Sequence, residues 1–287
     1  MDCKGNILIA DAGSTKIRWT LLCSDGNSIS FTSPGVNPLV PPAQGLQQAY
    51  REALSPNLPD QSIDSIYYYG AGCIPSKTEE VAEALRSAVD CNPEIFVASD
   101  LLGAARSLLG HDRGIAAVIG TGSIACLYDG SQIQSQIPAL GFILGDEGSG
   151  AWLGKTLLNG VLKRQLPQQV IDRFNERYSL SVDEIIDNVY RRSQPNRFLA
   201  SFAPFFSENR DRESLAGIVR EGFNQFLRLN IIPIEEASSL PVRFTGSVAG
   251  SFSQLLTDCC HRLGLNDVQI TADPSEGLIK YHQNIKS

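Results

Sequence analysis

Two short turns rich in glycine, serine and threonine stand out as places where the chain could bind a phosphate group. The apolar run at residues 7–10 ends in Asp-Ala-Gly-Ser-Thr at 11–15, and the apolar run at 115–119 ends in Gly-Thr-Gly-Ser at 120–123. Such turns expose consecutive backbone N–H groups and small hydroxyls, which suits a phosphate. Because each turn opens one half of the chain, the pair predicts duplicated domains with a nucleotide triphosphate between them.

The first turn carries the clearest phosphate-binding set, Gly13, Ser14, Thr15 and Lys16. We expect Asp11, which precedes it, to hold a magnesium ion through water. The alternative is a tight hairpin corner in which Asp11 only accepts turn hydrogen bonds. Lys16 could instead have a surface or capping role without any contact with phosphate. The second turn favours phosphate binding and adds a matching set, Gly120, Thr121, Gly122 and Ser123.

Asp100 directly follows an apolar run at residues 94–98 and precedes a helical pattern that starts at Leu101. An aspartate in this place is a good helix N-cap. It is also a candidate general base, because phosphoryl transfer needs positioning, charge neutralisation and a carboxylate near the nucleophile. The two roles are compatible, and Asp100 is the predicted catalytic residue.

Residues 141–154 hold several glycines around Asp146 and Glu147, just before a predicted helix. One interpretation is a helix start with Asp146 as its cap. That interpretation leaves most of the glycines without a role. A substrate that approaches the backbone closely explains them better, with Gly145 beside it and Asp146 accepting hydrogen bonds from sugar hydroxyls. Glu147 stays open between a surface role and contact with magnesium or phosphate.

A third small-residue turn follows the apolar run at residues 242–245. It begins with Thr245, Gly246 and Ser247, and it could seat a flat adenine against bare backbone. A simple strand-to-helix turn is the competing interpretation.

The elements that must position these turns alternate between strands and helices. In the first half we expect strands at 7–10, 17–22, 28–32, 63–69 and 94–98, and helices at 45–54, 78–89 and 101–109. In the second half we expect strands at 115–119, 124–128, 133–136, 242–245 and 268–271, and late helices at 249–263 and 274–284.

This order predicts an α/β fold with two mixed sheets covered by helices. We expect one domain at residues 1–105 and a second at 106–273, with a helical insertion at about 148–232 in the second. A last helix at about 274–287 is a candidate to pack back on the first domain. In such sheets ligands sit beyond the carboxyl ends of strands, where all three small-residue turns fall.

Composition excludes several classes of partner. The chain has 287 residues, 43% of them hydrophobic, and a formal net charge of −7. An acidic chain without a basic cluster is not expected to bind nucleic acid or an anionic membrane. The seven cysteines show no metal-ligand spacing, and no apolar stretch reaches the length of a membrane span. We therefore expect a soluble, cytoplasmic protein.

Together these motifs resemble the sugar kinase, Hsp70 and actin superfamily. Within it, they are similar to the N-acetylglucosamine kinase-like branch of the BadF/BadG/BcrA/BcrD-type ATPases. The turn at 11–16 looks like the first phosphate motif, 120–123 the second and 245–247 the adenosine motif. The run Gly-Asp-Glu-Gly-Ser-Gly at 145–150 resembles the hallmark of that branch.

The resemblance implies two ribonuclease-H-like, actin-like ATPase domains and an enzyme that uses ATP and Mg2+ to phosphorylate the 6-hydroxyl of N-acetylglucosamine. Asp100 then matches the catalytic base, and Asn37 matches an asparagine that binds sugar hydroxyls. Thr121 and Asp146 match further sugar contacts. A homodimer is implied as well. The residues flanking the sugar motifs, Pro38 and Ala139-Leu140, depart from the branch pattern, so N-acetylmuramic acid and glucosamine stay open as substrates.

Two functions of other classes compete with the kinase. An activator-type ATPase would carry cysteines for an iron–sulfur cluster, which requires four thiolates, and no such pattern is present. A sugar sensor without catalysis would not need both acidic residues, Asp100 and Asp146.

Overall fold

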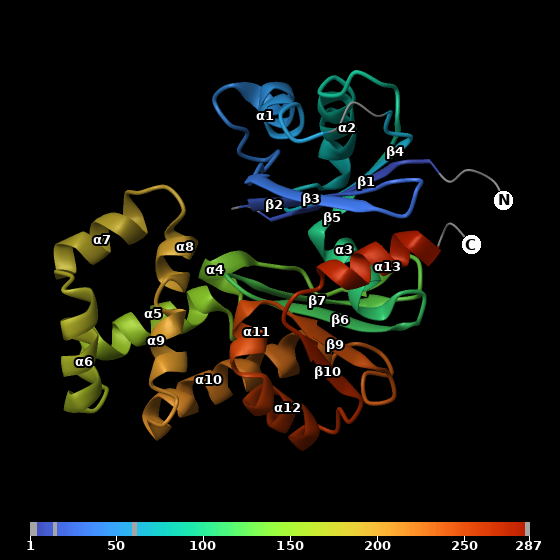
Figure 1. The fold of residues 1–287 in the computed structure, drawn as a ribbon. Helices are drawn as coiled ribbons and strands as arrows, with labels where there is room; N and C mark the ends of the chain where they lie inside the picture. Colours follow the sequence, from blue (N-terminus) through green and yellow to red (C-terminus); the bar gives the residue numbers. More distant parts are fainter. Residues whose placement is uncertain (1–4, 14–15, 59–61, 285–287) are drawn as a thin grey trace. The chain divides into compact units, whose positions relative to one another are not determined.

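The computed structural model describes residues 5–13, 16–58 and 62–284 and divides into two compact units (Figure 1). The first unit comprises Met1–Gly110 and Ser275–Ser287, and the second comprises His111–Pro274. The division falls after Gly110 rather than after residue 105, because the helix that starts at Asp100 runs on to Leu109 and packs against strands of the first unit. The last helix also belongs to the first unit.

The first unit contains one mixed sheet of five strands in the order β3-β2-β1-β4-β5. These strands are β1 (Ile7–Ala12), β2 (Lys16–Leu22), β3 (Ser28–Pro34), β4 (Ser65–Gly70) and β5 (Glu94–Ser99). β1 pairs antiparallel with β2 and parallel with β4, and β5 continues the parallel side. β1 is buried almost throughout because it lies at the centre of the sheet.

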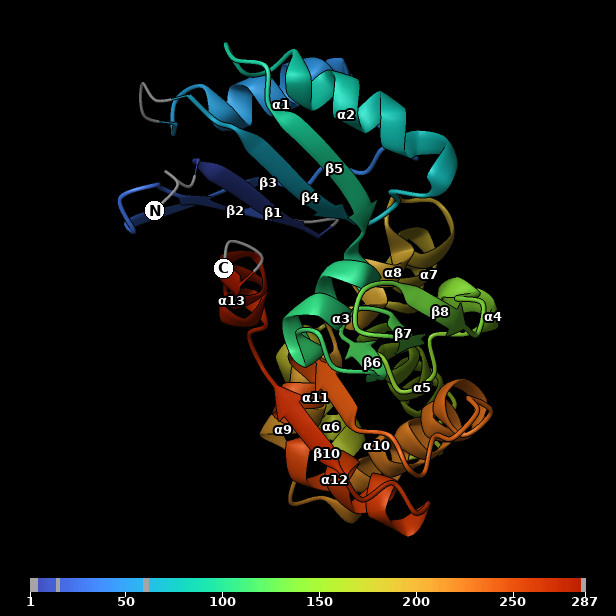
Figure 2. The same cartoon turned by 90° about the vertical axis from the view of Figure 1, so that its right-hand side faces the viewer.

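Helices cover both faces of the first sheet. Figure 2 shows α1 (Gly45–Leu54) and α2 (Thr78–Arg86) over one face, and α3 (Asp100–Leu109) and α13 (Ser275–Asn284) over the other. A short 3-10 helix, Pro75–Lys77, leads into α2. Trp19, Tyr50 and Tyr68 pack together in the core under α1 and α2.

The helix α13 is attached to α3 by a buried polar and aromatic cluster. Arg106 of α3 donates a hydrogen bond of 2.7 Å to the hydroxyl of Tyr69, which lies 3.0 Å from Nε2 of His282 in α13. The guanidinium of Arg106 stands 4.9 Å from the ring centre of Phe96. Gly277 is needed in α13, because a Cβ there would overlap with Ser107 of α3. The two helices are therefore closely packed.

The second unit repeats the sheet and adds helices. Its five strands have the order β10-β9-β6-β7-β8. They are β6 (Gly114–Ile119), β7 (Ser123–Tyr128), β8 (Ile133–Gln136), β9 (Val242–Thr245) and β10 (Val268–Thr271). β6 pairs antiparallel with β7 and parallel with β9, as β1 does with β2 and β4. The two mixed sheets with flanking helices confirm the predicted fold class.

The helices of the second unit differ in detail from the expected ones. They are α4 (Gly141–Leu144), α5 (Gly150–Leu162), α6 (Gln168–Tyr178), α7 (Val182–Tyr190), α8 (Pro195–Ala200), α9 (Ala203–Glu208), α10 (Glu213–Phe226), α11 (Ser247–Ser251) and α12 (Ser253–Arg262). The single helix expected at 249–263 is wrong. The chain breaks at Phe252, whose backbone leaves the helical region and whose ring packs 6.5 Å from that of Phe223. A π-helical turn, Leu227–Ile231, extends α10.

Among the described residues, no helix is both long enough and apolar enough to cross a membrane.

Candidate active site

In the first unit the predicted site residues Asp11 and Asp100 lie at the carboxyl ends of β1 and β5, on either side of β4. The register pairs Ala12 of β1 with Gly70 of β4, and Gly70 with Ser99 of β5. The N–H of Ala71 donates a hydrogen bond of 2.9 Å to the carbonyl of Ala12, so the loop after β4 is attached to the end of β1. Asp11, this loop and Asp100 therefore share one edge of the sheet.

Asp100 is the first residue of α3, but it is not the helix cap. The cap is Ser99, whose hydroxyl accepts a hydrogen bond of 3.3 Å from the N–H of Leu102. Asp100 uses Oδ1 to accept a bond of 3.0 Å from the N–H of Leu101, and its side chain stays accessible to water. The capping interpretation of Asp100 is thus wrong because a serine one position earlier does that work.

The pKa of the Asp100 carboxyl is raised above its ordinary value. The main cause is desolvation by the protein around the carboxyl, and the negative charge of Asp11 adds to it, while the N–H of Leu101 acts in the opposite direction. A carboxylate with a raised pKa binds a proton more strongly. Asp100 therefore combines access for a ligand with the properties of a general base.

Asp11 lies near the end of β1, which β4 separates from β5. Asp11 is half-buried near the end of β1, where it lies opposite Arg18 of β2 and Tyr69 of β4. Gly13 is half-buried, and Lys16 is exposed at the start of β2. Ser14 and Thr15 lie outside the described residues.

Asn37 stands beside the loop that follows β4. Its side chain is half-buried, and Oδ1 accepts a hydrogen bond of 2.9 Å from the N–H of Leu39. Asn37 packs directly against Gly72 of that loop. The next loop residue, Cys73, is buried, and burial together with the charge of Asp100 raises the pKa of its thiol to about 12. Asn37 therefore belongs to the same edge of the sheet as Asp100.

In the second unit the predicted turn at 120–123 is joined to the hallmark segment. The N–H of Ser123 donates a hydrogen bond of 3.2 Å to Oδ1 of Asp146, and the hydroxyl of Ser123 donates one of 2.8 Å to the carbonyl of Glu147. A Cβ on Gly122 would lie 3.0 Å from both carboxylate oxygens of Asp146. Because Gly122 has no side chain, the Asp146 carboxylate can lie against the turn at 120–123. Thr121 of this turn is exposed.

Asp146 is not the cap of α5. That cap is Ser149, whose hydroxyl accepts a hydrogen bond of 3.2 Å from the N–H of Trp152. Asp146 itself has a positive φ of 57° and is half-buried. Desolvation raises the pKa of its carboxyl, opposed first by the hydrogen bond from Ser123. Glu147 accepts a hydrogen bond of 3.2 Å from the side chain of Asn230, which gives this ambiguous residue a structural partner.

Three glycines of the segment 141–154 pack so closely against other parts of the unit that a side chain would not fit. A Cβ on Gly148 would lie 2.9 Å from the carbonyl oxygen of Gly222, and one on Gly150 would lie 3.2 Å from that of Gly120. A Cβ on Gly154 would overlap with the backbone of Leu199 in α8. Packing within the unit accounts for these three glycines, and the expected approach of a substrate to the segment stays a prediction. A Cβ on Gly141 would meet no atom within 4 Å, and one on Gly145 would lie 3.3 Å from Cβ of Leu140.

The third turn lies next to the second because β9 runs parallel to β6. Gly246 has φ of 110°, and a Cβ there would lie 2.6 Å from the carbonyl carbon of Ile119. Ser247 is exposed at the first position of α11. Thus Gly120–Ser123, Asp146 and Gly246-Ser247 gather at one edge of the second sheet, as predicted for residues after strand ends.

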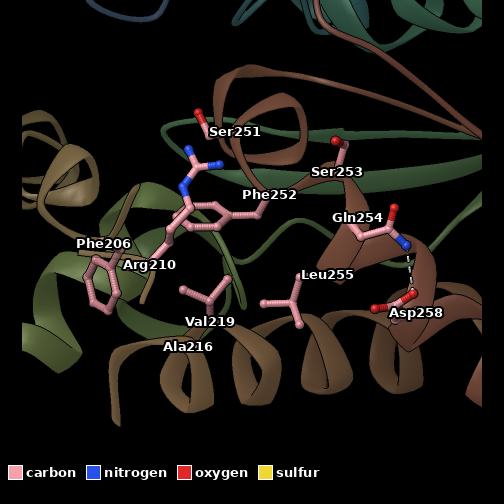
Figure 3. A pocket seen from close by; sticks show the side chains of 10 residues that line it. All are labelled: Phe206, Arg210, Ala216, Val219, Ser251, Phe252, Ser253, Gln254, Leu255 and Asp258. Carbon is pink, nitrogen blue, oxygen red and sulfur yellow. Dashed lines mark hydrogen bonds between the residues drawn. The ribbon is translucent and has the colours of Figure 1, made fainter. Parts of the chain in front are cut away.

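A cavity of about 300 Å³ opens in the second unit beside α11 (Figure 3). Part of its wall is apolar, formed by Phe206, Ala216, Val219, Phe252 and Leu255, and the rest is polar, formed by Arg210, Ser251, Ser253, Gln254 and Asp258. Arg210 lies at its edge and donates a hydrogen bond of 3.0 Å to the carbonyl of Ser207. Sequence reasoning missed these residues, since the alternation of apolar positions in α10 indicates core packing and does not reveal a gap. The only signal was the adjacent third turn.

Among the described residues, no group of three His, Cys, Asp or Glu side chains could hold a metal ion. Mg2+ that accompanies a nucleotide needs only one or two carboxylates, because phosphate oxygens and water supply the other ligands. The accessible carboxylate edge of Asp11 and Asp100 fits such an ion.

Comparison with known proteins identifies the relatives of the chain. A Porphyromonas gingivalis protein described as "putative N-acetylglucosamine kinase" is 40% identical over 98% of this chain and 100% of its own, with a TM-score of 0.91. A Chromobacterium violaceum protein with the same description matches at 17% identity, covering 98% and 99% of the two chains, with a TM-score of 0.71. A Streptomyces griseus ROK family glucokinase, solved with glucose and AMPPNP, matches at 17% identity over 98% and 99%, with a TM-score of 0.55. The latter two likenesses concern the fold alone. No protein-family model and no curated protein matches.

Proposed function

Since this chain belongs to the sugar kinase family of the Porphyromonas gingivalis protein, we propose that it is an ATP-dependent kinase that phosphorylates the 6-hydroxyl of N-acetylglucosamine. The observation that carries the proposal is the edge of the first sheet, where an accessible Asp100 with a raised pKa stands with Asp11 and Asn37. N-acetylmuramic acid and glucosamine are the alternative substrates.

In the proposed reaction Asp100 accepts the proton of the sugar hydroxyl as its oxygen attacks the γ-phosphorus of ATP. The new O–P bond forms while the bond to the β–γ bridging oxygen breaks, and ADP leaves. Asn37 binds the sugar beside Asp100. Thr121, Gly145 and Asp146 remain the sugar contacts that the sequence predicts on the second unit. Asp11 would hold Mg2+, which supplies positive charge to the phosphates when it is bound.

The cavity beside α11 is the proposed subsite for the adenine base of ATP. It touches the last residue of the helix that Gly246 and Ser247 begin, and its wall combines apolar side chains with polar ones, as ligand sites commonly do. The helix and the cavity both lie in the second unit, and the helix begins at the third turn, for which the sequence predicts adenine binding.

Filling this cavity is expected to weaken ATP binding. Ala216→Leu places three further carbon atoms in the cavity from α10, and we expect the KM for ATP to rise by about tenfold, which corresponds to roughly 1.4 kcal/mol. Gly217→Leu is the matched control on the same helix, because a side chain at Gly217 enters open space. Steady-state ADP release at saturating sugar measures both. Equal KM values for the two variants would place the base elsewhere.

The raised pKa of Asp100 predicts how the activity depends on pH. Asp100 must be ionised to accept a proton, so kcat/KM should fall as the pH drops through the raised pKa of the free enzyme. This acid limb is expected above the ordinary aspartate value of about 3.9. A pH series of ADP release, with circular dichroism at each pH to verify folding, provides the measurement. An acid limb at or below the ordinary value would contradict this assignment.

The experiment that tests the proposal is ADP release by the purified protein with Mg-ATP and N-acetylglucosamine, N-acetylmuramic acid, glucosamine, glucose or no sugar. Turnover that depends on N-acetylglucosamine supports the proposal, and turnover with only one other amino sugar would replace the substrate. Hydrolysis that does not depend on sugar would favour an activator-type ATPase. Binding of a sugar without turnover would favour a sensor.

A further inference from the structure

We propose that Gly72 is a positioning residue for the sugar, because it holds the Asn37 carboxamide in the one orientation that turns its NH2 group toward the ligand. The inference rests on the proposed function, in which Asn37 binds the substrate. It concerns three parts of the first unit: the loop around Asn37, the loop after β4, and the edge of the sheet that carries Asp100.

The orientation of the Asn37 side chain follows from the chemistry of its partner. A backbone N–H can only donate, so the side-chain atom that lies 2.9 Å from the N–H of Leu39 must be the carbonyl oxygen, Oδ1. The main-chain carbonyl of Asn37 also accepts, from the N–H of Val40 at 3.0 Å. Both carbonyl oxygens of this residue thus serve its own turn. The donor that this side chain offers to a ligand is the amide nitrogen, Nδ2.

Gly72 makes this arrangement sterically feasible. Its φ is 78°, and a Cβ at this position would overlap with Oδ1 of Asn37, lie 3.1 Å from Cγ of Asn37 and lie 3.4 Å from Cγ of Leu39. Any other residue would therefore displace the carboxamide that the Leu39 N–H holds. The Asn37 side chain occupies the space that the missing side chain of Gly72 leaves.

The loop around Gly72 is itself fixed, so it can act as a rigid support. The N–H of Ala71 donates a hydrogen bond to the carbonyl of Ala12 at the end of β1. The N–H of Cys73 donates a hydrogen bond of 3.1 Å to the carbonyl of Gly70. The N–H of Ile74 donates a hydrogen bond of 2.9 Å to the carbonyl of Gly72. Since Cys73 lies close enough to Asp100 to feel its charge, this loop connects the sugar-binding amide with the proposed base.

The orientation has a consequence for the substrate. A donor such as Nδ2 needs a lone pair on its partner, which a hydroxyl oxygen or an acyl carbonyl provides. An ammonium group has no lone pair and cannot accept this bond. The sugar atom that meets Nδ2 is therefore an acceptor oxygen, and a protonated amine is unsuited to this hydrogen bond.

Gly72→Ala tests the proposal, with Gly45→Ala as the matched control. Gly45 has a similar φ of 83° in the same unit, but a Cβ there meets no atom within 4 Å. Both variants carry the same backbone strain, and only Gly72→Ala displaces Asn37. We expect Gly72→Ala to raise the KM for sugar by about tenfold relative to Gly45→Ala, the effect of losing one hydrogen bond. The KM for ATP should be the same in both.

Further variants test whether the sugar binds to the NH2 group of Asn37 and whether Gly72 acts through Asn37. Asn37→Asp keeps an oxygen for the N–H of Leu39 but cannot donate, so we expect it to raise the sugar KM as much as Asn37→Ala does. In the double variant Asn37→Ala/Gly72→Ala, the effect of Gly72→Ala on KM should largely disappear, because the group that it displaces is absent. Wild-type KM in Asn37→Asp, or equal KM in Gly72→Ala and Gly45→Ala, would overturn the proposal.

Calorimetric titration with the sugar in the absence of ATP distinguishes this inference from the proposed function. If the wild type binds sugar but does not release ADP, the kinase proposal fails, while the Kd values of the five variants still decide the role of Gly72. If the wild type binds none of the sugars, both proposals fail.

Discussion

Replacing Asp100 by Asn is expected to lower kcat for sugar-dependent ADP release by about 100-fold or more, since general-base catalysis contributes at least that factor. The change is nearly isosteric, and the amide oxygen can still accept the N–H of Leu101 as Oδ1 does in the wild type. Ser99 retains the cap of α3, so the helix start is not disturbed. Steady-state kinetics at saturating ATP and sugar give the measurement.

Asp90→Asn is a suitable control for this variant, because Asp90 is an exposed aspartate of the same unit. This substitution also removes one negative charge, but Asp90 is not at the carboxyl ends of the strands, where the site lies. It should therefore leave kcat unchanged. Circular dichroism of both variants verifies the fold. Turnover of Asp100→Asn within a few-fold of wild type would show that another group accepts the proton.

Asp146→Asn is expected to lower kcat/KM for the sugar by about 10- to 100-fold. A hydrogen bond to an ionised acceptor contributes roughly 1.5–3 kcal/mol, and the substitution removes the charge of the acceptor. The amide oxygen can still accept the N–H of Ser123, so the turn at 120–123 should persist. The KM for sugar and the KM for ATP are measured separately.

The neighbouring carboxylate offers the matched control for Asp146. Glu147→Gln also removes one charge, but the side chain of Glu147 is engaged by Asn230, and its amide oxygen can keep that contact. We expect its sugar KM to stay within a few-fold of wild type. If Asp146→Asn and Glu147→Gln behaved alike, the effect would come from the local charge and not from a sugar contact at Asp146.

The predictable part of the fold is the part governed by local patterns. The strands before the three turns were predicted because runs of apolar residues that end in glycine and serine are visible within ten residues of sequence, as at Gly120 and Gly246. The caps were misassigned because serine competes with aspartate for the same position, and at α3 and α5 Ser99 and Ser149 cap the helices.

The parts of the site that sequence reasoning missed depend on contacts between distant residues. Nothing near Gly154 reveals that Leu199 lies against it, and nothing near Gly72 reveals the side chain of Asn37. The break at Phe252 likewise depends on Phe223 in another helix. Asn37 itself was found through family resemblance, since a single asparagine before a proline carries no chemical signature of its own.

The attachment of α13 to α3 has a consequence for how the chain folds as it is synthesised. Domains generally fold in order from the N-terminus during synthesis. Here the first unit lacks one of its helices until residues 275–284 leave the ribosome, after the whole second unit. Until then the surface of α3 that carries Arg106 has no helix over it. The core cluster of the first unit consists of residues 8–88 and does not need α13, so only the face of the sheet that α3 and α13 cover closes last.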